Sequence, residues 1–284
     1  MLATPDITLE NPSNQAGGRF GGSVAHIGDV DGDGHADLAV GAWGQNVDQP
    51  DDGAVFVYHG GPEGTPTTPN AAWTARAMSL APTTATVFAP AGDVNGDGYA
   101  DLIVGAYSEY DPTAMVSMAG AAFVYHGGPP TLSPTRRVRI HEPDGQHGAA
   151  FGFSVTSADM NGDGYADVVV GTPNRSAGAP YEGNAFVFRG GATGATNPPS
   201  IPLDNPENQA EGRFGFVVAC VGDVNGDGYA DLAVGAPRQD AGAGDEGNTY
   251  IYHGGSTGVP LAPSTTLDSP ENQASGGFGS SVAH

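Results

Sequence analysis

The sequence contains no lysine and a single cysteine, and no apolar stretch in it approaches the roughly 20 residues that a transmembrane helix needs. All nine basic residues are therefore arginines, and they face 32 acidic residues, so the formal net charge is −23. A chain this acidic is repelled by phosphate backbones and anionic membrane surfaces, which excludes ordinary nucleic-acid binding. The single cysteine, Cys220, excludes a disulfide framework and a cysteine-based zinc site.

Motifs of common catalytic and cofactor sites are also scarce. The sequence contains no His-Glu-x-x-His string and no cysteine–histidine arrangement. One Gly-x-Gly-x-x-Gly string spans 242–247, but no helical pattern follows it, as a dinucleotide site requires. We therefore expect a protein that is not an enzyme.

Glycine and proline, by contrast, are abundant, at 46 and 23 of 284 residues. Without a collagen-like period, such a content suggests disorder unless the residues recur in a regular order. They do recur, around four strings that begin at Asp29, Asp93, Asp159 and Asp223, with starts 64, 66 and 64 residues apart. The strings are DVDGDGHAD, DVNGDGYAD, DMNGDGYAD and DVNGDGYAD. A period of this length indicates a repeat architecture.

Each repeat has the pattern of four short strands separated by turns. In the first repeat, Phe20-Gly21 begins an apolar alternation, residues 38–42 form an apolar run after the acidic string, and residues 55–58 alternate aromatic and aliphatic side chains. A fourth segment closes the unit, as at residues 137–140. The nearly continuous apolar run is typical of a strand buried on both faces. Four strands in each repeat predict β-propeller blades, because β-helices use much shorter repeats.

We therefore predict an all-β fold, a β-propeller of four-stranded antiparallel blades. The predicted blades span 20–87, 88–150, 151–213 and 214–277. Residues 265–284 match residues 7–26 at 13 of 20 positions, so the chain carries more than four whole blades. We expect a surplus outer edge strand at 7–12 and a surplus inner edge strand at 278–284, whose unpaired backbone groups invite pairing.

The acidic strings place oxygen ligands at short, regular intervals. We expect the side chains at positions 1, 3 and 5 to point into one turn, with a backbone carbonyl at position 7 and a further carboxylate at position 9. Ca²⁺ takes about six to eight oxygen ligands at flexible geometry, whereas Mg²⁺ demands near-octahedral geometry and retained waters. Glycine at position 6 permits the sharp bend. A solvated turn would explain one such string, but four in register predict Ca²⁺ binding.

About four Ca²⁺ ions, one in each blade, would reduce the formal net charge from −23 to −15. An EF-hand is excluded, because valine replaces its bidentate glutamate and strands flank the loop. Since the ions would join the first two strands of each blade, their binding energy would stabilise the fold. The predicted metal-site residues are Asp29, Asp31, Asp33, His35, Asp37, Asp93, Asn95, Asp97, Tyr99, Asp101, Asp159, Asn161, Asp163, Tyr165, Asp167, Asp223, Asn225, Asp227, Tyr229 and Asp231, with His35, Tyr99, Tyr165 and Tyr229 binding through the backbone carbonyl.

Recurrent histidines and aromatic residues outside these strings are expected to be structural. His59, His126 and His253 occupy the same place in their repeats. Because equivalent positions are spread around a propeller, we expect them to cap strand ends rather than to share one metal ion. Trp43 and Tyr107 follow the second strand of their repeats, and ordinary packing is favoured there over stacking on a sugar.

Phe-Gly, an acidic loop and Val-Gly-Ala-Pro (residues 234–237) follow one another in an order that resembles the FG-GAP repeats of integrin α-subunit propellers and their bacterial relatives. The resemblance covers essentially the whole chain. It implies a propeller, usually of seven blades, with Ca²⁺ loops between the first two strands of each blade, in a secreted or cell-surface protein. Two features depart from it: Phe88-Ala89-Pro90 stands in place of Phe-Gly, and only four blades are present.

The resemblance implies a non-catalytic binding or adhesion scaffold with a protein or carbohydrate ligand. Two alternatives stay open: a non-catalytic propeller module of a secreted hydrolase, and an excised or engineered fragment that assembles through its surplus strands. Residues 1–5 have neither the basic start nor the apolar stretch of a signal peptide, so we expect a mature or excised segment. We expect no nucleic-acid partner and no membrane insertion, and either a poorly closed monomer or a homodimer paired through the edge strands.

Overall fold

The computed structural model describes residues 6–42, 44–46, 54–74, 87–109, 119–240, 242–271 and 273–282. Regular secondary structure in these ranges consists of β-strands. Among the same residues, no helix is long and apolar enough to cross a membrane.

The strands form four antiparallel sheets in which spatial order follows chain order, β1-β2-β3-β4, β5-β6-β7-β8, β9-β10-β11-β12 and β13-β14-β15-β16. Their bounds are β1 Phe20–Gly28, β2 Asp37–Ala42, β3 Ala54–Tyr58, β4 Ala71–Thr74, β5 Val87–Gly92, β6 Asp101–Ala106, β7 Ala121–Tyr125, β8 Arg137–His141, β9 Ser154–Ala158, β10 Asp167–Thr172, β11 Asn184–Phe188, β12 Ile201–Asp204, β13 Val217–Gly222, β14 Asp231–Ala236, β15 Asn248–Tyr252 and β16 Thr265–Asp268. The prediction of four four-stranded blades is confirmed.

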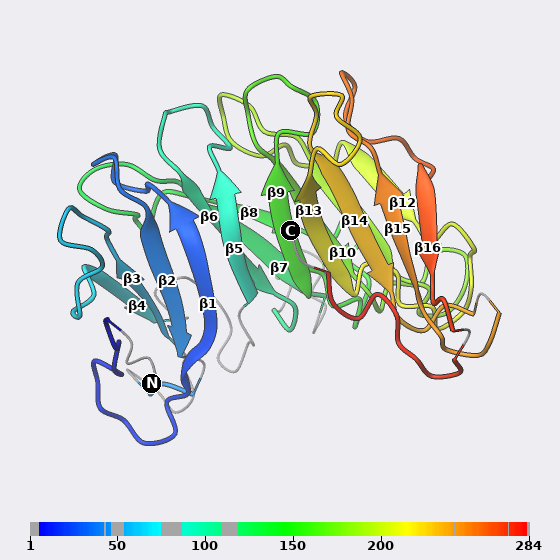
Figure 1. Cartoon of the computed structure of the whole chain (residues 1–284), viewed down its shortest axis with the longest axis horizontal. Coiled ribbons are helices and arrows are strands. Elements are labelled where there is room, and N and C mark those ends of the chain that lie inside the picture. The colour runs from blue at the N-terminus through cyan, green and yellow to red at the C-terminus, as the bar shows by residue number, and fades with distance from the viewer. Residues whose placement is uncertain are drawn as a thin grey trace.

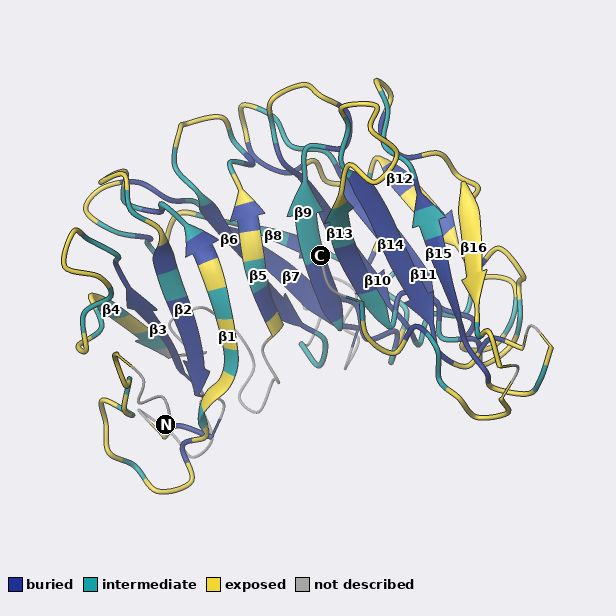
Figure 2. Cartoon of the chain, viewed as in Figure 1, coloured by how far each residue is buried: buried dark blue, intermediate teal, exposed yellow. Residues whose placement is uncertain are grey.

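The four blades stand side by side and form an open arc (Figure 1). The first strands of successive blades contact one another in the order β1, β5, β9 and β13. The middle strands β6, β7, β10 and β11 are buried along their whole length, whereas β16, at one end of the arc, is exposed throughout (Figure 2). The continuously apolar runs in the sequence therefore mark strands that are covered on both faces.

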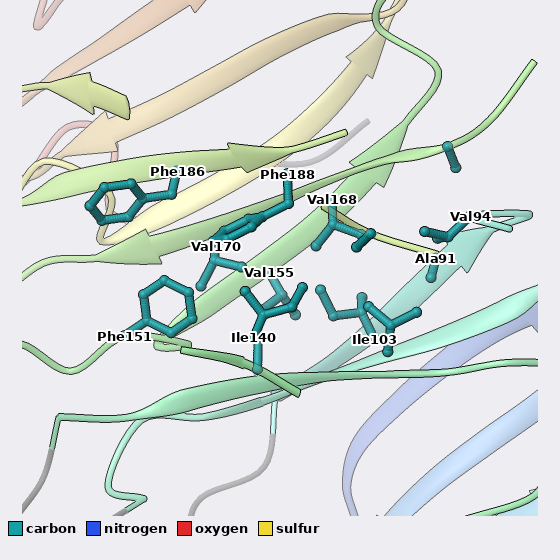
Figure 3. Close-up of a cluster of buried hydrophobic side chains, with 14 residues drawn as sticks. Ala91, Val94, Ile103, Ile140, Phe151, Val155, Val168, Val170, Phe186 and Phe188 are labelled. Atoms are coloured by element: carbon teal, nitrogen blue, oxygen red, sulfur yellow. The ribbon is translucent and has the colours of Figure 1, made fainter. Parts of the chain in front are cut away.

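Neighbouring blades are held together by one hydrophobic cluster at each junction. Between the second and third blades, Ile103 and Ile140 lie in one cluster with Val168, Phe186 and Phe188 (Figure 3). Aliphatic side chains of one sheet thus meet the aromatic face of the next. Equivalent clusters join the first blade to the second and the third to the fourth.

The Phe-Gly step docks the third and the fourth blade on the blade before it. The Phe214 N–H donates to the Glu182 carbonyl at 2.8 Å. The carbonyl oxygen of Gly215 then lies so close to β10 that a Cβ atom at Gly171 would stand 2.1 Å from it. Glycine in the second strand is therefore required by the close approach of two backbones.

Strand register corrects one sequence-based expectation. Phe88 pairs with Val104, which is the place that Val155 and Val218 hold in the third and fourth blades. Phe88-Ala89 is therefore a strand segment and not the counterpart of Phe-Gly. In addition, β5 begins at Val87, one residue before the predicted boundary of the second blade. A phenylalanine fits an inward strand position as well as a valine does, so its identity alone misplaced the motif.

The two surplus segments differ from their prediction as well, since neither 7–12 nor 278–282 is a strand. Residues 283–284 lie outside the described residues. Each segment nevertheless makes contacts that a neighbouring blade would make. Leu9 packs on the hydrophobic cluster of the first blade. The Phe278 N–H donates to the Glu246 carbonyl at 2.7 Å, as the Phe214 N–H does to the Glu182 carbonyl. Because the described residues offer no middle strand beside either segment, neither has a partner for a β-ladder.

Candidate metal centre

Each acidic string forms a loop between the first and second strands of its blade, and its first aspartate organises that loop. In the fourth blade, the Asp223 carboxylate accepts N–H groups from Gly226 at 2.7 Å, Asp227 at 3.0 Å and Gly228 at 2.8 Å. Gly228 has a φ of 91°, in the left-handed region that favours glycine. These hydrogen bonds, the one from Gly228 above all, lower the pKa of Asp223. The Asp223 carboxylate is thus held ionised.

The aspartate at position 9 lies at the base of the loop, at the start of the second strand. Asp37 is buried and accepts N–H groups from Val30 and Gly60, both at 2.8 Å. The same residue is buried in the other three blades, as Asp101, Asp167 and Asp231. This carboxylate ties the loop to the end of the third strand, so that it has a structural role besides any role as a ligand.

In the first blade, three of the predicted ligands converge. Asp29, Asp31 and Asp37 each offer a carboxylate oxygen, and these oxygens lie within 4.8 Å of one another. Asp33, at position 5, instead accepts the His35 N–H at 2.8 Å. Three hard oxygen donors at this spacing suit a divalent cation such as Ca²⁺.

The third blade supplies a test of whether a cation fits. Asp167 is buried, and the Met160 N–H, whose counterparts donate to the equivalent Oδ2 in the other three blades, approaches its Oδ2 only loosely. Burial raises the pKa of Asp167 to about 6; backbone hydrogen bonds from Gly190 and Met160 lower this pKa, and the nearby carboxylates of Asp163 and Asp159 raise it further. A bound cation would oppose the repulsion between the carboxylates, so these residues fit the predicted ion.

Positions 3 and 5 are neighbours in the other three loops. Asparagine at position 3 donates from Nδ2 to the aspartate at position 5, in the pairs Asn95–Asp97 at 3.0 Å, Asn161–Asp163 at 2.9 Å and Asn225–Asp227 at 2.9 Å. The structure thus brings these predicted ligands together within each loop. The backbone carbonyls of His35, Tyr99, Tyr165 and Tyr229 stay a prediction.

Successive loops also touch one another. The ring of Tyr99 covers the first loop so closely that a Cβ atom at Gly32 would stand 2.4 Å from its Cε1. The Ala100 N–H donates to the Asp29 carbonyl at 2.9 Å. Tyr165 and Tyr229 lie in the same way over Gly96 and Gly162. An ion in one loop would therefore also stabilise the junction with the next blade.

Sequence reasoning missed the contacts of the histidines. His59 Nδ1 lies 2.7 Å from Asp31 Oδ2, and His126 Nδ1 lies 3.0 Å from Asp101 Oδ2. Their recurrence directly after the third strand was the available signal, because that strand ends beside the acidic loop. In the fourth blade, the backbone N–H of His253 donates to Ser264 Oγ at 3.1 Å.

Of the aromatic residues considered for sugar stacking, Trp43 lies outside the described residues. The Tyr107 ring lies 5.4 Å from that of Phe153, centre to centre. This contact favours the packing role expected for Tyr107. Cys220 is half-buried and unpaired.

These sheets and loops match known repeats. Residues 86–125, 151–188 and 217–252 match the family described as FG-GAP repeat, and residues 29–104 match the one described as FG-GAP-like repeat. The chain therefore carries FG-GAP repeats.

It is, further, distantly similar to integrin alpha subunits. It is 36% identical over 146 residues to integrin alpha-4 of Xenopus laevis, with 47% of this chain and 14% of the relative covered. Integrin alpha-7 of Mus musculus is 33% identical over 191 residues, with 63% of this chain and 15% of the relative covered. The chain thus spans about one seventh of the length of these curated relatives.

Two solved structures match the chain at low sequence identity and with TM-scores below 0.5. Rhamnogalacturonan lyase YesW is 13% identical, with a TM-score of 0.45, 89% of this chain and 50% of the lyase chain being covered. The exotype rhamnogalacturonan lyase YesX is 14% identical, with a TM-score of 0.47 and coverages of 91% and 51%.

Proposed function

We propose that the chain is a Ca²⁺-stabilised, non-catalytic binding or adhesion scaffold of a secreted or cell-surface protein, with a protein or carbohydrate ligand. The observation that carries the Ca²⁺ part is the convergence of Asp29, Asp31 and Asp37 in the first blade, whose carboxylate oxygens lie within 4.8 Å of one another. The buried carboxyl of Asp167, whose pKa the nearby Asp163 and Asp159 help to raise, supports the same chemistry in the third blade.

A non-catalytic role is supported by the position of Ser256, which lies in a string with the glycine spacing of a hydrolase nucleophile. Residues 254–258 have the sequence Gly-Gly-Ser-Thr-Gly, which matches the Gly-x-Ser-x-Gly of hydrolases. In the structure this string lies between β15 and β16, where the Gly258 N–H donates to the Gly255 carbonyl. A nucleophile elbow joins a strand to a helix, so the string lacks the required context.

We also propose that copies of this chain associate through the ends of the arc. Leu267 on β16 is 44% exposed, whereas its counterpart Leu203 on β12 is fully buried by the fourth blade. An apolar surface of a second copy would cover β16.

Removal of the ions tests the proposed function. We expect excess chelator to lower the melting temperature substantially, because a ligand that binds only the folded state stabilises it by mass action. Calorimetric titration of the metal-free protein with Ca²⁺ should give about four sites. A melting transition that excess chelator leaves unmoved would overturn the proposal.

Asp227→Ala should remove one ligand from the loop of the fourth blade and lower the Ca²⁺ stoichiometry by one. Asp268→Ala is the matched control, because Asp268 is an exposed aspartate on the same blade. Full stoichiometry in Asp227→Ala, or an equal loss in both variants, would contradict the assignment of this loop.

A further inference from the structure

The turn that begins the first, third and fourth blades is repeated once more after the fourth blade. Residues 213–216 have the sequence Arg-Phe-Gly-Phe, and residues 277–280 have Gly-Phe-Gly-Ser. In the first turn the Phe216 N–H donates to the Arg213 carbonyl at 3.1 Å, and in the second the Ser280 N–H donates to the Gly277 carbonyl at 3.0 Å. Their φ angles at the first position are 61° and 62°. The backbones are equivalent, but the second turn lacks two large side chains.

Those two side chains fill the junction between the third and fourth blades. The Arg213 guanidinium lies 5.5 Å from the centre of the Tyr181 ring and donates to Asn174. The Phe216 ring lies 4.9 Å from that of Phe153. This junction is thus occupied by an aromatic ring and a planar cation.

At the equivalent place beyond the fourth blade, smaller and more polar residues leave a cavity of about 490 Å³, the end pocket. Gly277 stands in place of Arg213, Ser280 in place of Phe216, and Asp245 in place of Tyr181. The end pocket is lined by Phe216, Pro237, Arg238, Asp245, Ser275 and Ser280, besides Gly277. Its volume lies within the range of about 300–1,000 Å³ that is typical of small-molecule sites.

We propose that the end pocket binds a neutral pyranose sugar, with the apolar face of the sugar ring on Phe216. An aromatic wall offers a flat contact area, and Pro237 extends it. The Asp245 carboxylate, the Arg238 guanidinium and the hydroxyls of Ser275 and Ser280 can accept or donate hydrogen bonds to sugar hydroxyls. Apolar contact with a few placed polar groups is the usual composition of a ligand site.

The charges of the end pocket and of the whole chain favour a neutral sugar over an acidic one. The pocket holds one carboxylate and one guanidinium, and Arg238 is paired only at 3.8 Å with the exposed Glu211. The chain as a whole carries a formal charge of −23, which disfavours an acidic sugar. A neutral sugar avoids this repulsion and still uses both charged groups as hydrogen-bond partners.

The test is binding of methyl pyranosides of glucose, galactose, mannose and N-acetylglucosamine, measured by saturation-transfer NMR and calorimetry in saturating Ca²⁺. Glucuronate and the peptide acetyl-Arg-Phe-Gly-Phe-amide are run beside them. We expect at least one neutral pyranoside to bind with a dissociation constant on the order of millimolar, as for a small, shallow site. No pyranoside binding, stronger binding of glucuronate, or binding of the peptide alone would overturn the proposal.

Single substitutions test whether the sugar binds in the end pocket. Ser280→Phe restores the ring that the preceding turn carries and should abolish sugar binding without lowering the melting temperature. Asp245→Asn keeps the shape of the pocket, removes its negative charge and should weaken binding about tenfold. Glu271→Gln, the same loss of charge at an exposed position, should change nothing. Sugar binding that survives both pocket variants unchanged would overturn the proposal.

This inference rests on the binding role within the proposed function, and its failure is distinguishable from a failure of that function. The response of the melting transition to chelator does not involve the end pocket. A protein that melts earlier in chelator and binds none of the sugars rejects the pocket assignment alone.

Discussion

At the scale of single residues, the burial of Asp167 predicts that the stability of the metal-free protein depends on pH. The pKa of this carboxyl is raised to about 6 in the folded protein, mainly by burial, whereas an unfolded aspartate has a pKa near 3.9. Folding of the metal-free chain therefore favours the protonated form. The stability that this group contributes is fully present below about pH 4 and is lost as the pH rises through about 6.

Asp167→Asn should therefore stabilise the metal-free protein at pH 7.5, by about 2 kcal/mol, and should have little effect at pH 4. The variant should also lose one Ca²⁺, since a neutral amide is the weaker ligand. Chemical unfolding of the metal-free proteins across pH 4–8 gives the first result, and calorimetry gives the second. If the two stability curves ran parallel over this range, the titration would belong to other groups.

That the acidic residues of each loop lie close together could be predicted from the sequence, because they fall within nine residues of one another. Their geometry depends on local turns, such as the hydrogen bond from the Gly32 N–H to Asp29 Oδ1 at 2.7 Å. The contact between His59 and Asp31 could not be predicted in the same way, because it spans 28 residues of chain. It depends on the pairing of β2 with β3, which sets where the third strand ends.

At the scale of strands and turns, close backbone contact decides which glycines matter. Gly171→Ala would place a Cβ atom 2.1 Å from the Gly215 carbonyl oxygen and 2.2 Å from Ser154 Oγ. We expect it to destabilise the fold by about 3 kcal/mol, because neither β10 nor the docking turn can shift freely. Gly191→Ala is the control, since nothing lies within 4 Å of its Cβ position. Urea unfolding of both variants with Ca²⁺ present measures the difference, and equal stabilities would show that the docking turn moves.

The strands themselves were predictable because each repeat shows the same alternation four times. In the second repeat, the counterpart of Phe-Gly was placed wrongly at Phe88. This residue instead fills an inward strand position that pairs with Val104. The two edge segments were predicted as strands from their likeness to β1 and β16, but the described structure gives them no partner strand. Backbone pairing, and not local preference, decides whether such a segment becomes a strand.

At the scale of the whole molecule, the charge of −23 sets how the metal-free protein responds to salt. Carboxylates gathered in the four loops repel one another, and at 0.5 M NaCl their interaction is screened within a few ångströms. We expect this salt to raise the melting temperature of the metal-free protein and to change that of the Ca²⁺-loaded protein much less. Differential scanning fluorimetry in four conditions tests this. An equal response in both states would indicate that the loops do not limit stability.

The open arc also leads to a prediction about assembly. The last blade presents β16 with Leu267 exposed, whereas at each internal junction the equivalent surface is covered by the next blade. We expect copies to associate end to end, because burying such an apolar face is favourable.

Sedimentation velocity at several concentrations should therefore show a species larger than the 28.5 kDa monomer that grows with concentration. Leu267→Asp should shift this equilibrium toward monomer, because a carboxylate would be desolvated at the contact. Leu261→Asp makes the same change at a loop residue that is 70% exposed, and it should leave the equilibrium alone. A monomer at every concentration would reject end-to-end association, and an equal effect of the two variants would place the contact elsewhere.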